Sequence, residues 1–170
     1  MKCTSCKKKS NFQHEKRNYC RSCYCKLIER RIGKYLRTNS PIKKDDILFI
    51  KEPLLEFIIK KIVKGMPFKI VKRKTKISKE VSLWTLDDEV AFFIDRFFSK
   101  NFKMKIRKGL SPLRPITDKE AQLYAKFKKL KFIPNKKPDS YKLLKSLEKK
   151  YPELFFSISR SIKELEKVFR

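Results

Sequence analysis

Apolar residues recur along this chain in blocks whose spacing alternates between that of a helix and that of a buried strand. Residues 26–37 carry an apolar stripe at helical spacing with basic residues on the other side, which predicts a basic amphipathic helix. Residues 46–50 contain a short apolar run, as expected of a buried strand. Residues 53–64 are apolar nearly all round, which predicts a buried helix with proline in its first turn and Gly65 at its end.

Two more short strands are expected at residues 68–71 and 80–85. The order strand, helix, strand, with buried runs in the strands, predicts a parallel α/β sheet. We therefore expect an α/β fold in which a truncated Rossmann-like sheet follows a cysteine-rich N-terminal knuckle and precedes a helical C-terminal part.

The second half of the chain is predicted to be mostly helical. A helix begins at Leu86, where three acidic residues suit the positive end of its dipole, and its many phenylalanines are expected in the core rather than at a subunit interface. Thr117 and Glu120 form a capping-box pattern at the start of the next helix. Asp139 is expected to cap the helix after that, and a last helix follows from Leu154 with an apolar stripe.

These elements divide the chain into three segments. Residues 1–37 hold the knuckle and the basic helix, residues 38–116 the small α/β domain, and residues 117–170 the C-terminal helices packed on it. A length of 170 residues suits one domain plus a small knuckle rather than two full domains.

Two Cys-x-x-Cys pairs lie close to the N-terminus, with thirteen residues between them. Each pair turns tightly enough to aim two sulfurs at one ion, so four thiolates can converge on one tetrahedral metal, for which we expect a single Zn²⁺. The ion is expected to fold this short segment, which has little core of its own. The expected ligands are Cys3, Cys6, Cys20 and Cys23.

Two further residues near the knuckle are spare. Cys25 is an alternative to Cys23 as the fourth ligand, and His14 is a second candidate substitute. Four reduced structural thiols or a redox dithiol are the other interpretations of the same cysteines.

The charge of the chain indicates a polyanionic partner. Lysine and arginine number 46 against 18 aspartate and glutamate, which gives a formal net charge of +28. Nucleic acid is the expected partner and an anionic membrane surface the second choice. Against a membrane, no apolar run approaches the ~20 residues of a membrane span, and no lipidation motif is found. A lysine-rich chain with metal-type cysteines and no signal peptide indicates a cytoplasmic protein.

Three groups of basic residues are expected to contact RNA: the knuckle, the basic helix and residues 101–115, a loop or edge segment without acidic residues. These side chains would mostly contact phosphates, which gives affinity and orientation rather than base reading. Phe12 and Tyr19 either stack on bases or pack beneath the metal. The expected RNA-binding residues are Lys7, Lys8, Lys9, Arg17, Arg21, Arg30, Arg31, Lys34, Arg37, Lys103, Lys105, Arg107, Lys108 and Arg114.

Several short motifs, taken in their order along the chain, resemble a known family. The knuckle pair and basic helix are followed by Asp46-Ile47-Leu48-Phe49-Ile50, Leu86-Asp87-Asp88-Glu89-Val90, Pro112-Leu113-Arg114-Pro115-Ile116 and Leu147-Glu148-x-Lys150-Tyr151-Pro152. This order resembles the tRNA 2-thiouridine synthetase family, which includes the TtuA-type proteins and the cytosolic thiouridylase subunits. The resemblance covers most of the chain in pieces and implies a sheet of the PP-loop ATPase type.

The chain departs from the active members of that family at the nucleotide site. Active members place a glycine-rich pyrophosphate loop, Ser-Gly-Gly-Lys-Asp-Ser, after the first strand, whereas here that strand runs into Lys51-Glu52-Pro53. A nest of amides around phosphate needs glycine, proline removes a donor, and a glutamate repels the anion. Active members also use cysteines within the domain for an iron–sulfur cluster or a sulfur relay, and no cysteine follows Cys25 here.

The resemblance therefore implies a degenerate, non-catalytic relative that resembles the large thiouridylase subunit. Such a protein would bind tRNA and assist an active PP-loop partner of the same family in 2-thiolation, or would self-associate. Neither ATP nor an iron–sulfur cluster is expected as a cofactor. Asp87 and Asp88, which align with a family acidic motif near the nucleotide, are expected to cap a helix. The alternative is a stand-alone zinc-ribbon RNA-binding protein, ribosome-associated or regulatory.

Overall fold

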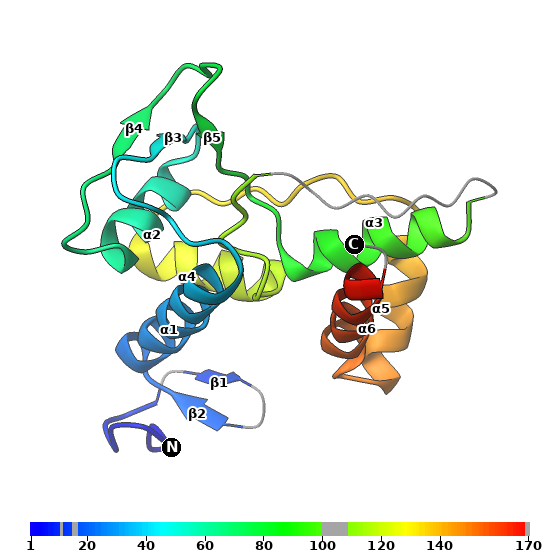
Figure 1. Cartoon of the computed structure of the whole chain (residues 1–170). Coiled ribbons are helices and arrows are strands. Elements are labelled where there is room, and N and C mark those ends of the chain that lie inside the picture. Colours follow the sequence, from blue (N-terminus) through cyan, green and yellow to red (C-terminus); the bar gives the residue numbers. More distant parts are fainter. Residues whose placement is uncertain (11, 15–16, 100–108, 169–170) are drawn as a thin grey trace.

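The chain adopts a mixed α/β fold, which confirms the predicted class. The computed structural model describes residues 1–10, 12–14, 17–99 and 109–168. A cysteine-rich N-terminal ribbon leads into a long helix, then into a small parallel sheet and a helical C-terminal part (Figure 1). Among the helices described, none combines the length and the apolar character that crossing a bilayer requires.

The N-terminal ribbon continues directly into the basic helix. Strands β1 (Phe12–His14) and β2 (Arg17–Tyr19) pair antiparallel, and helix α1 (Arg21–Asn39) follows at once. The helix therefore begins before the predicted start at residue 26. Cys20 takes the extended conformation of an N-cap residue, so the second cysteine pair lies at the entrance of the helix and not in a loop before it.

Three short parallel strands form the sheet, in the order β4-β3-β5. The strand β3 (Ile47–Phe49) lies in the middle, and helix α2 (Pro53–Ile62) connects it to β4 (Lys69–Val71). The apolar run of β3 suits this central position, since both faces of a central parallel strand are covered. Helix α2 ends at Ile62, before the predicted Gly65, and the backbone N–H of Val63 makes its last helical bond, to Ile59 at 2.8 Å.

The third strand, β5 (Lys79–Glu80), is shorter than predicted and begins one residue earlier. Beyond Glu80, Val81 forms an isolated parallel bridge to Leu110 and donates its backbone N–H to the carbonyl of Phe49 at 3.0 Å. Thr85 already serves as the N-cap of the next helix. The alternation of apolar residues that suggested a longer strand therefore belongs to an extended connection between the sheet and that helix.

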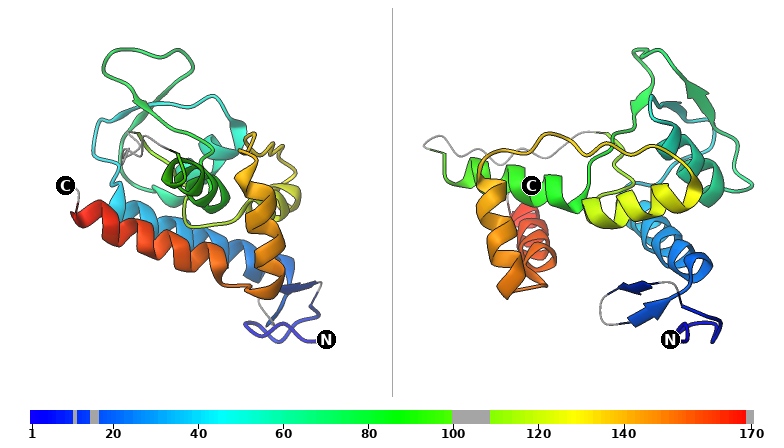
Figure 2. Two further views of the ribbon diagram at one scale, coloured as in Figure 1. Left: turned by 90° about the vertical axis from the view of Figure 1, so that its right-hand side faces the viewer. Right: turned by 180° about the vertical axis from the view of Figure 1, so that it is seen from behind.

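Among the described residues beyond the sheet there are four helices: α3 (Leu86–Phe97), α4 (Asp118–Lys128), α5 (Ser140–Lys150) and α6 (Leu154–Val168). Figure 2 shows α5 and α6 side by side below α3, while α4 lies against α1. The capping box of Thr117 and Glu120 at the start of α4 is confirmed, since each side chain bonds the backbone N–H of the other residue. Asp139 stands at the N-cap position of α5, but its side chain makes no capping bond.

Buried apolar residues form two cores. The first joins α1, α2, the sheet and α4, and the second joins α3, α5 and α6. The first core draws residues from all three predicted segments of the chain.

The phenylalanines of α3 are only partly core residues. Phe93 packs against the second core, whereas Phe97 is 51% exposed and Phe98, just beyond the helix, is 77% exposed. The expectation that the phenylalanines of this helix are buried is therefore wrong for the last two. Figure 1 shows this end of α3 extending past α5 and α6.

Candidate metal centre and nucleic-acid interface

The four predicted metal ligands converge on one point. The sulfur atoms of Cys3, Cys6, Cys20 and Cys23 all lie within 4.8 Å of one another, and those of Cys6 and Cys20 are 3.6 Å apart. The first pair sits in a turn that Lys7 closes in the left-handed region, with its N–H bonded to the carbonyl of Cys3 at 2.9 Å. The second pair straddles the start of α1. Two turns far apart in sequence thus aim four thiols at one site.

The two spare residues lie elsewhere. Cys25 is buried in the first core, two positions further along α1 than Cys23, and it is not part of the sulfur cluster. His14 turns the other way, toward α4, where its Nε2 lies 3.1 Å from a carboxylate oxygen of Glu120. Among the described residues, the arrangement therefore favours Cys23 over both alternatives as the fourth ligand.

The thiols of this cluster fit a cation. Burial opposes ionisation of Cys3, but backbone N–H groups, with that of Cys20 foremost, outweigh it and lower its pKa to about 6. The pKa of Cys23 is raised to about 12, chiefly by its interaction with Cys6 and then by burial. Four thiolates so close together repel one another, so the full set ionises only around a positive ion. A four-sulfur donor set of this kind suits Zn²⁺ or an iron–sulfur centre.

Strand β1, which follows the first cysteine pair, packs against α1 and α4. The ring of Phe12 lies 4.9 Å from that of Tyr24 on α1 and 5.3 Å from that of Phe127 on α4. Tyr19 is buried in the first core. Of the two roles considered for Phe12 and Tyr19, packing beneath the metal is therefore the one that their surroundings support, rather than stacking on bases.

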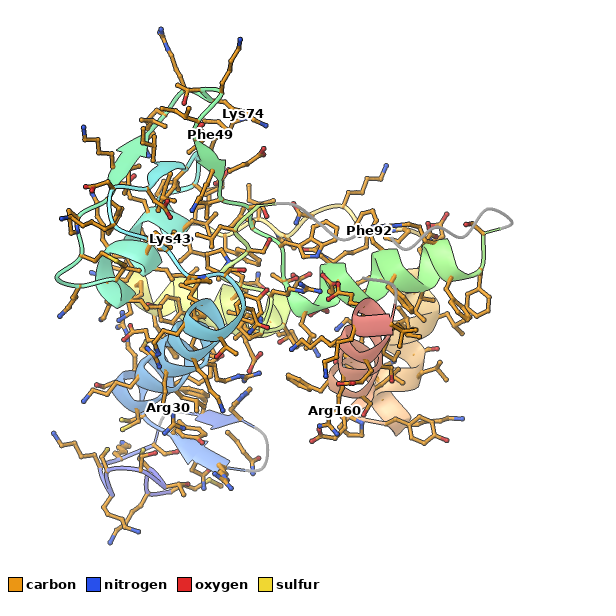
Figure 3. The ribbon with its side chains drawn as sticks, viewed as in Figure 1. Arg30, Lys43, Phe49, Lys74, Phe92 and Arg160 are labelled. Atoms are coloured by element: carbon orange, nitrogen blue, oxygen red, sulfur yellow. The ribbon has the colours of Figure 1, made fainter. Side chains whose placement is uncertain are left out.

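Most of the described residues expected to bind RNA point outward. Arg30 illustrates this on α1 (Figure 3), and Arg21 lies over the ring of Phe127 while it also bonds that residue's carbonyl oxygen. The predicted contacts at Lys103, Lys105, Arg107 and Lys108 lie outside the described residues. The exposed members of the predicted set are Lys7, Lys8, Lys9, Arg17, Arg21, Arg30, Lys34 and Arg37.

Arg31 and Arg114 instead point into the protein. Arg31 bonds the carboxylate of Glu120 and, at 2.9 Å, the carbonyl of Pro115. Pro115 lies just before α4 and Glu120 lies in its first turn. Arg31 therefore connects α1 to the start of α4. It is better placed to stabilise the fold than to meet a phosphate.

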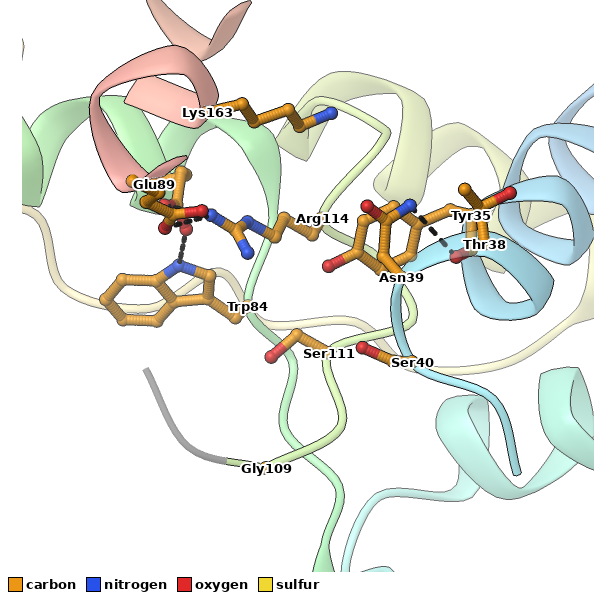
Figure 4. A pocket seen from close by; sticks show the side chains of 11 residues that line it. Tyr35, Thr38, Asn39, Ser40, Trp84, Glu89, Gly109, Ser111, Arg114 and Lys163 are labelled. Atoms are coloured by element: carbon orange, nitrogen blue, oxygen red, sulfur yellow. Dashed lines mark hydrogen bonds and ion pairs between the residues drawn. The ribbon is translucent and has the colours of Figure 1, made fainter. Parts of the chain in front are cut away.

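Arg114 lies in a polar pocket of about 240 Å³ where α1, α3 and α6 meet (Figure 4). Its guanidinium is 2.6 Å from Glu89 and 3.0 Å from Glu166, and the indole N–H of Trp84 donates to Glu89 at 2.8 Å. Tyr35 and Asn39 form the opposite wall. Two carboxylates already neutralise this arginine, so the pocket offers no surplus positive charge to a polyanion.

The turn after β3 has no nest of amides for a phosphate. Glu52 takes the N-cap position of α2 without a capping bond, and Pro53 fills its first turn. Across the same end of the sheet, Lys72 donates to the carbonyl of Ile50 at 3.3 Å and lies 2.6 Å from Glu56. A lysine–glutamate pair of the chain itself thus lies beside the carboxyl end of the central strand.

A buried charge network lies at the start of α3, where the sequence predicts only a capping role for Asp87 and Asp88. Asp88 does form the capping box with Thr85, but it also lies 2.6 Å from the ammonium of Lys137. Asp87 accepts hydrogen bonds from the hydroxyl of Tyr141 at 2.6 Å and from the backbone of Asp118. Adjacent acidic residues in an otherwise apolar segment were the available signal, but the lysines that neutralise them lie some fifty positions away.

Comparison with known proteins gives a match in structure and none in sequence. No protein-family model and no curated protein matches the chain. A solved structure to which it is similar is "U34-tRNA thiolase NcsA from Methanococcus maripaludis" with its 4Fe-4S cluster. The superposition covers 97% of this chain and 87% of the other, with a TM-score of 0.72 and 17% sequence identity. The fold is therefore similar to that of a thiolase.

Proposed function

We propose that this chain is a non-catalytic, tRNA-binding subunit that assists an active PP-loop partner in tRNA 2-thiolation. Three features support the proposal: a fold similar to that of a tRNA thiolase, a net charge of +28, and a cluster of four thiols suited to a metal. Each of them agrees with binding to RNA. The feature that separates this role from that of an enzyme is the turn between β3 and α2.

In open α/β sheets, ligands bind outside the carboxyl ends of the strands, at the point where the strand order reverses. In this sheet that point is the end of β3, since β4 and β5 pair on opposite sides of it. A phosphate there would depend on free N–H groups at the start of α2. Pro53 has no N–H, Glu52 brings a negative charge, and Lys72 is held by Glu56. This turn is the observation that carries the proposal.

For the metal we propose zinc rather than an iron–sulfur cluster. A tetrahedral zinc with Zn–S bonds of about 2.3 Å holds its sulfurs about 3.8 Å apart. The thiols of this site lie within 4.8 Å of one another, with one pair at 3.6 Å. A four-iron cluster places each thiolate on a different iron, which needs a wider ring of sulfurs. The spacing supports one ion at the centre of four thiolates.

The test uses the full chain, tagged in its own cells. We expect it to capture tRNA together with a protein that carries a glycine-rich pyrophosphate loop, and to show no heat of ATP binding by calorimetry when purified alone. Recovery of RNA without such a protein, with unchanged 2-thiouridine in a knockout, would favour the stand-alone zinc-ribbon function. ATP hydrolysis or thiolation of a transcript by the purified chain would overturn the non-catalytic role.

A further inference from the structure

Three adjoining hollows follow α1 from the metal centre toward the end of α2. The first, about 260 Å³, is lined by Arg17, Lys26 and Arg30. The second, about 410 Å³, shares Arg30 with the first. The third, about 190 Å³, shares Gly33 and Arg37 with the second. Neighbouring hollows share lining residues, and we call the three together the α1 groove.

The first two hollows of the α1 groove are strongly basic. Glu29 is the acidic residue among their lining residues, and its carboxylate already lies 3.1 Å from Lys61 and 3.2 Å from Lys128. Apart from Lys61, the basic side chains of these hollows have no ion-pair partner in the described part of the chain. Their charge is therefore available to an anion. The basic residues concerned are Arg17, Lys26, Arg30, Arg37 and Lys64.

Helix geometry aligns this charge along a line. Lys26, Arg30 and Arg37 recur at four and seven positions, which places them on one face of α1. With a rise of about 1.5 Å per residue, they span about 16 Å of the helix. Phosphates of a stacked strand follow one another at about 3.4 Å along its axis, so this line matches up to about five nucleotides.

Gly33 lies between these basic residues and shapes the floor of the groove. A Cβ atom at this position would be 3.3 Å from the Ile62 side chain on α2 and 3.5 Å from the guanidinium of Arg37. The absence of a side chain therefore lets α2 approach α1 and lets the Arg37 head group lie against the helix.

The third hollow has a different character. Most of its lining is apolar, whereas Arg37 and Lys64 stand where it joins the basic part. A basic track that opens into an apolar recess matches a nucleotide, whose phosphate is charged and whose base has apolar faces. The apolar lining residues are Leu36, Pro41, Ile42, Ile62, Val63 and Met66.

We propose that the α1 groove binds a single strand of RNA, with successive phosphates on its basic residues and one unpaired base in the apolar recess. This inference rests on the proposed function and specifies which part of a tRNA the chain holds: a loop or an end, not a helical stem. In a duplex the bases are stacked inside, so no base would reach the recess.

The first test measures affinity for a labelled short oligouridylate by fluorescence anisotropy at several salt concentrations. Neutralising two groove residues, in the double variant Arg30→Gln with Arg37→Gln, should weaken binding about tenfold and reduce the salt dependence by about 1.4 in log–log slope. Arg160→Gln is the matched control, since Arg160 is exposed on α6, away from the groove (Figure 3). Equal losses in the control and the double variant would overturn the proposal.

The second test addresses the base. Met66 lies in the apolar recess but carries no charge and is only partly buried, so Met66→Glu should leave the fold intact. We expect the wild-type chain to bind oligouridylate several-fold better than an abasic strand of the same length, and Met66→Glu to abolish that difference. A duplex RNA that binds as tightly as the single strand and responds to the same variants would contradict the proposal.

The outcomes separate this inference from the proposed function. If the wild-type chain captures tRNA and the Arg30/Arg37 double variant captures it equally well, the α1 groove is wrong and the proposed function stands. If the wild-type chain captures no tRNA, the proposed function fails first. A last experiment measures binding to vesicles of phosphatidylcholine and phosphatidylserine. If the wild-type chain binds these vesicles more tightly than RNA, and the double variant loses that binding, the groove binds a membrane surface and the proposal is wrong.

Discussion

The ammonium group of Lys137 lies 2.6 Å from a carboxylate oxygen of Asp88, and both side chains are almost fully buried, at 8% and 0% exposure. The same ammonium is 2.8 Å from Asp118. Lys137 belongs to the extended segment between α4 and α5, which runs back along α3 (Figure 1). One lysine therefore ties the starts of α3 and α4 to the segment that carries the chain into the C-terminal helices.

Removing this lysine should be costly. In Lys137→Met the buried Asp88 and the partly buried Asp118 lose their cation, and breaking a buried pair in this way destabilises a protein by about 3 kcal/mol or more. Unfolding in urea, followed by circular dichroism, measures the loss. The neighbouring Lys136→Met is the control, since Lys136 is exposed, and we expect its free energy of unfolding to stay within about 0.5 kcal/mol of wild type. If both variants lost the same unfolding free energy, replacing the buried lysine would cost no more than replacing an exposed one, and the buried pair would add no stability.

Asp87 should make the stability depend on pH. Burial raises its pKa, but the hydroxyl of Tyr141 and the ammonium of Lys145 outweigh this and hold the pKa below its usual range. A lowered pKa in the folded state gives stability that is present above the usual pKa of about 4 and lost as the pH falls through the folded value. The difference in unfolding free energy between wild type and Asp87→Asn should therefore be large at neutral pH and shrink below pH 4.

Urea unfolding of Asp87→Asn and of wild type, at pH 7 and below pH 4, measures this effect. Asp139→Asn serves as the control because Asp139 is almost fully exposed, so its difference from wild type should stay near zero throughout. If the difference in unfolding free energy between wild type and Asp87→Asn were the same in acid as at pH 7, the carboxylate would contribute through its shape rather than its charge.

Replacing a cysteine of the cluster should release the metal. We expect Cys20→Ser to lose its zinc, measured by mass spectrometry of the metal content, and to loosen the first 25 residues, measured by hydrogen exchange. The α/β part should stay folded, because most of the first core lies outside that segment. Cys25→Ser is the matched control and should keep its zinc. Iron in the wild-type protein would contradict zinc, and unchanged zinc in Cys20→Ser would mean that the ligands are others.

Two neighbouring arginines of α1 should have opposite roles. Arg31 is held by Glu120 and Pro115, so Arg31→Gln should lower the free energy of unfolding by about 2 kcal/mol and leave RNA affinity near that of wild type. Arg30 lines the α1 groove, so Arg30→Gln should weaken RNA binding and leave stability unchanged. Fluorescence anisotropy gives the RNA affinity of the two variants, and urea unfolding gives their stability. Weaker RNA binding in Arg31→Gln together with lower stability in Arg30→Gln would contradict the structure.

The local pattern of the chain determined the elements and the cysteine cluster. The central strand at Ile47–Phe49, the helix that starts at Pro53 and the capping box of Thr117 and Glu120 all depend on residues close together in sequence. The same holds for the two cysteine pairs, because each pair makes its own turn. Each of these patterns lies within a few neighbouring residues, so it can be recognised without knowing how the chain packs.

Element ends were less predictable, because long-range contacts set them. The alternation through Val81, Leu83 and Thr85 suggested a longer strand, but Thr85 is bonded by Asp88 and Asp118 and begins a helix instead. The start of α1 was also not predicted, because its first residues have two roles: Cys23 belongs to the sulfur cluster, whereas Tyr24 and Cys25 are buried in the first core.

Composition and spacing alone determined that this chain is α/β, strongly basic, and equipped with four thiols that can meet. Which basic side chains face outward was decided only in three dimensions. Arg30 and Arg31 are adjacent and chemically identical, yet one lines a groove and the other neutralises a buried glutamate from a distant helix. The reason is that charge is a property of a residue, whereas its availability depends on the partners that folding brings beside it.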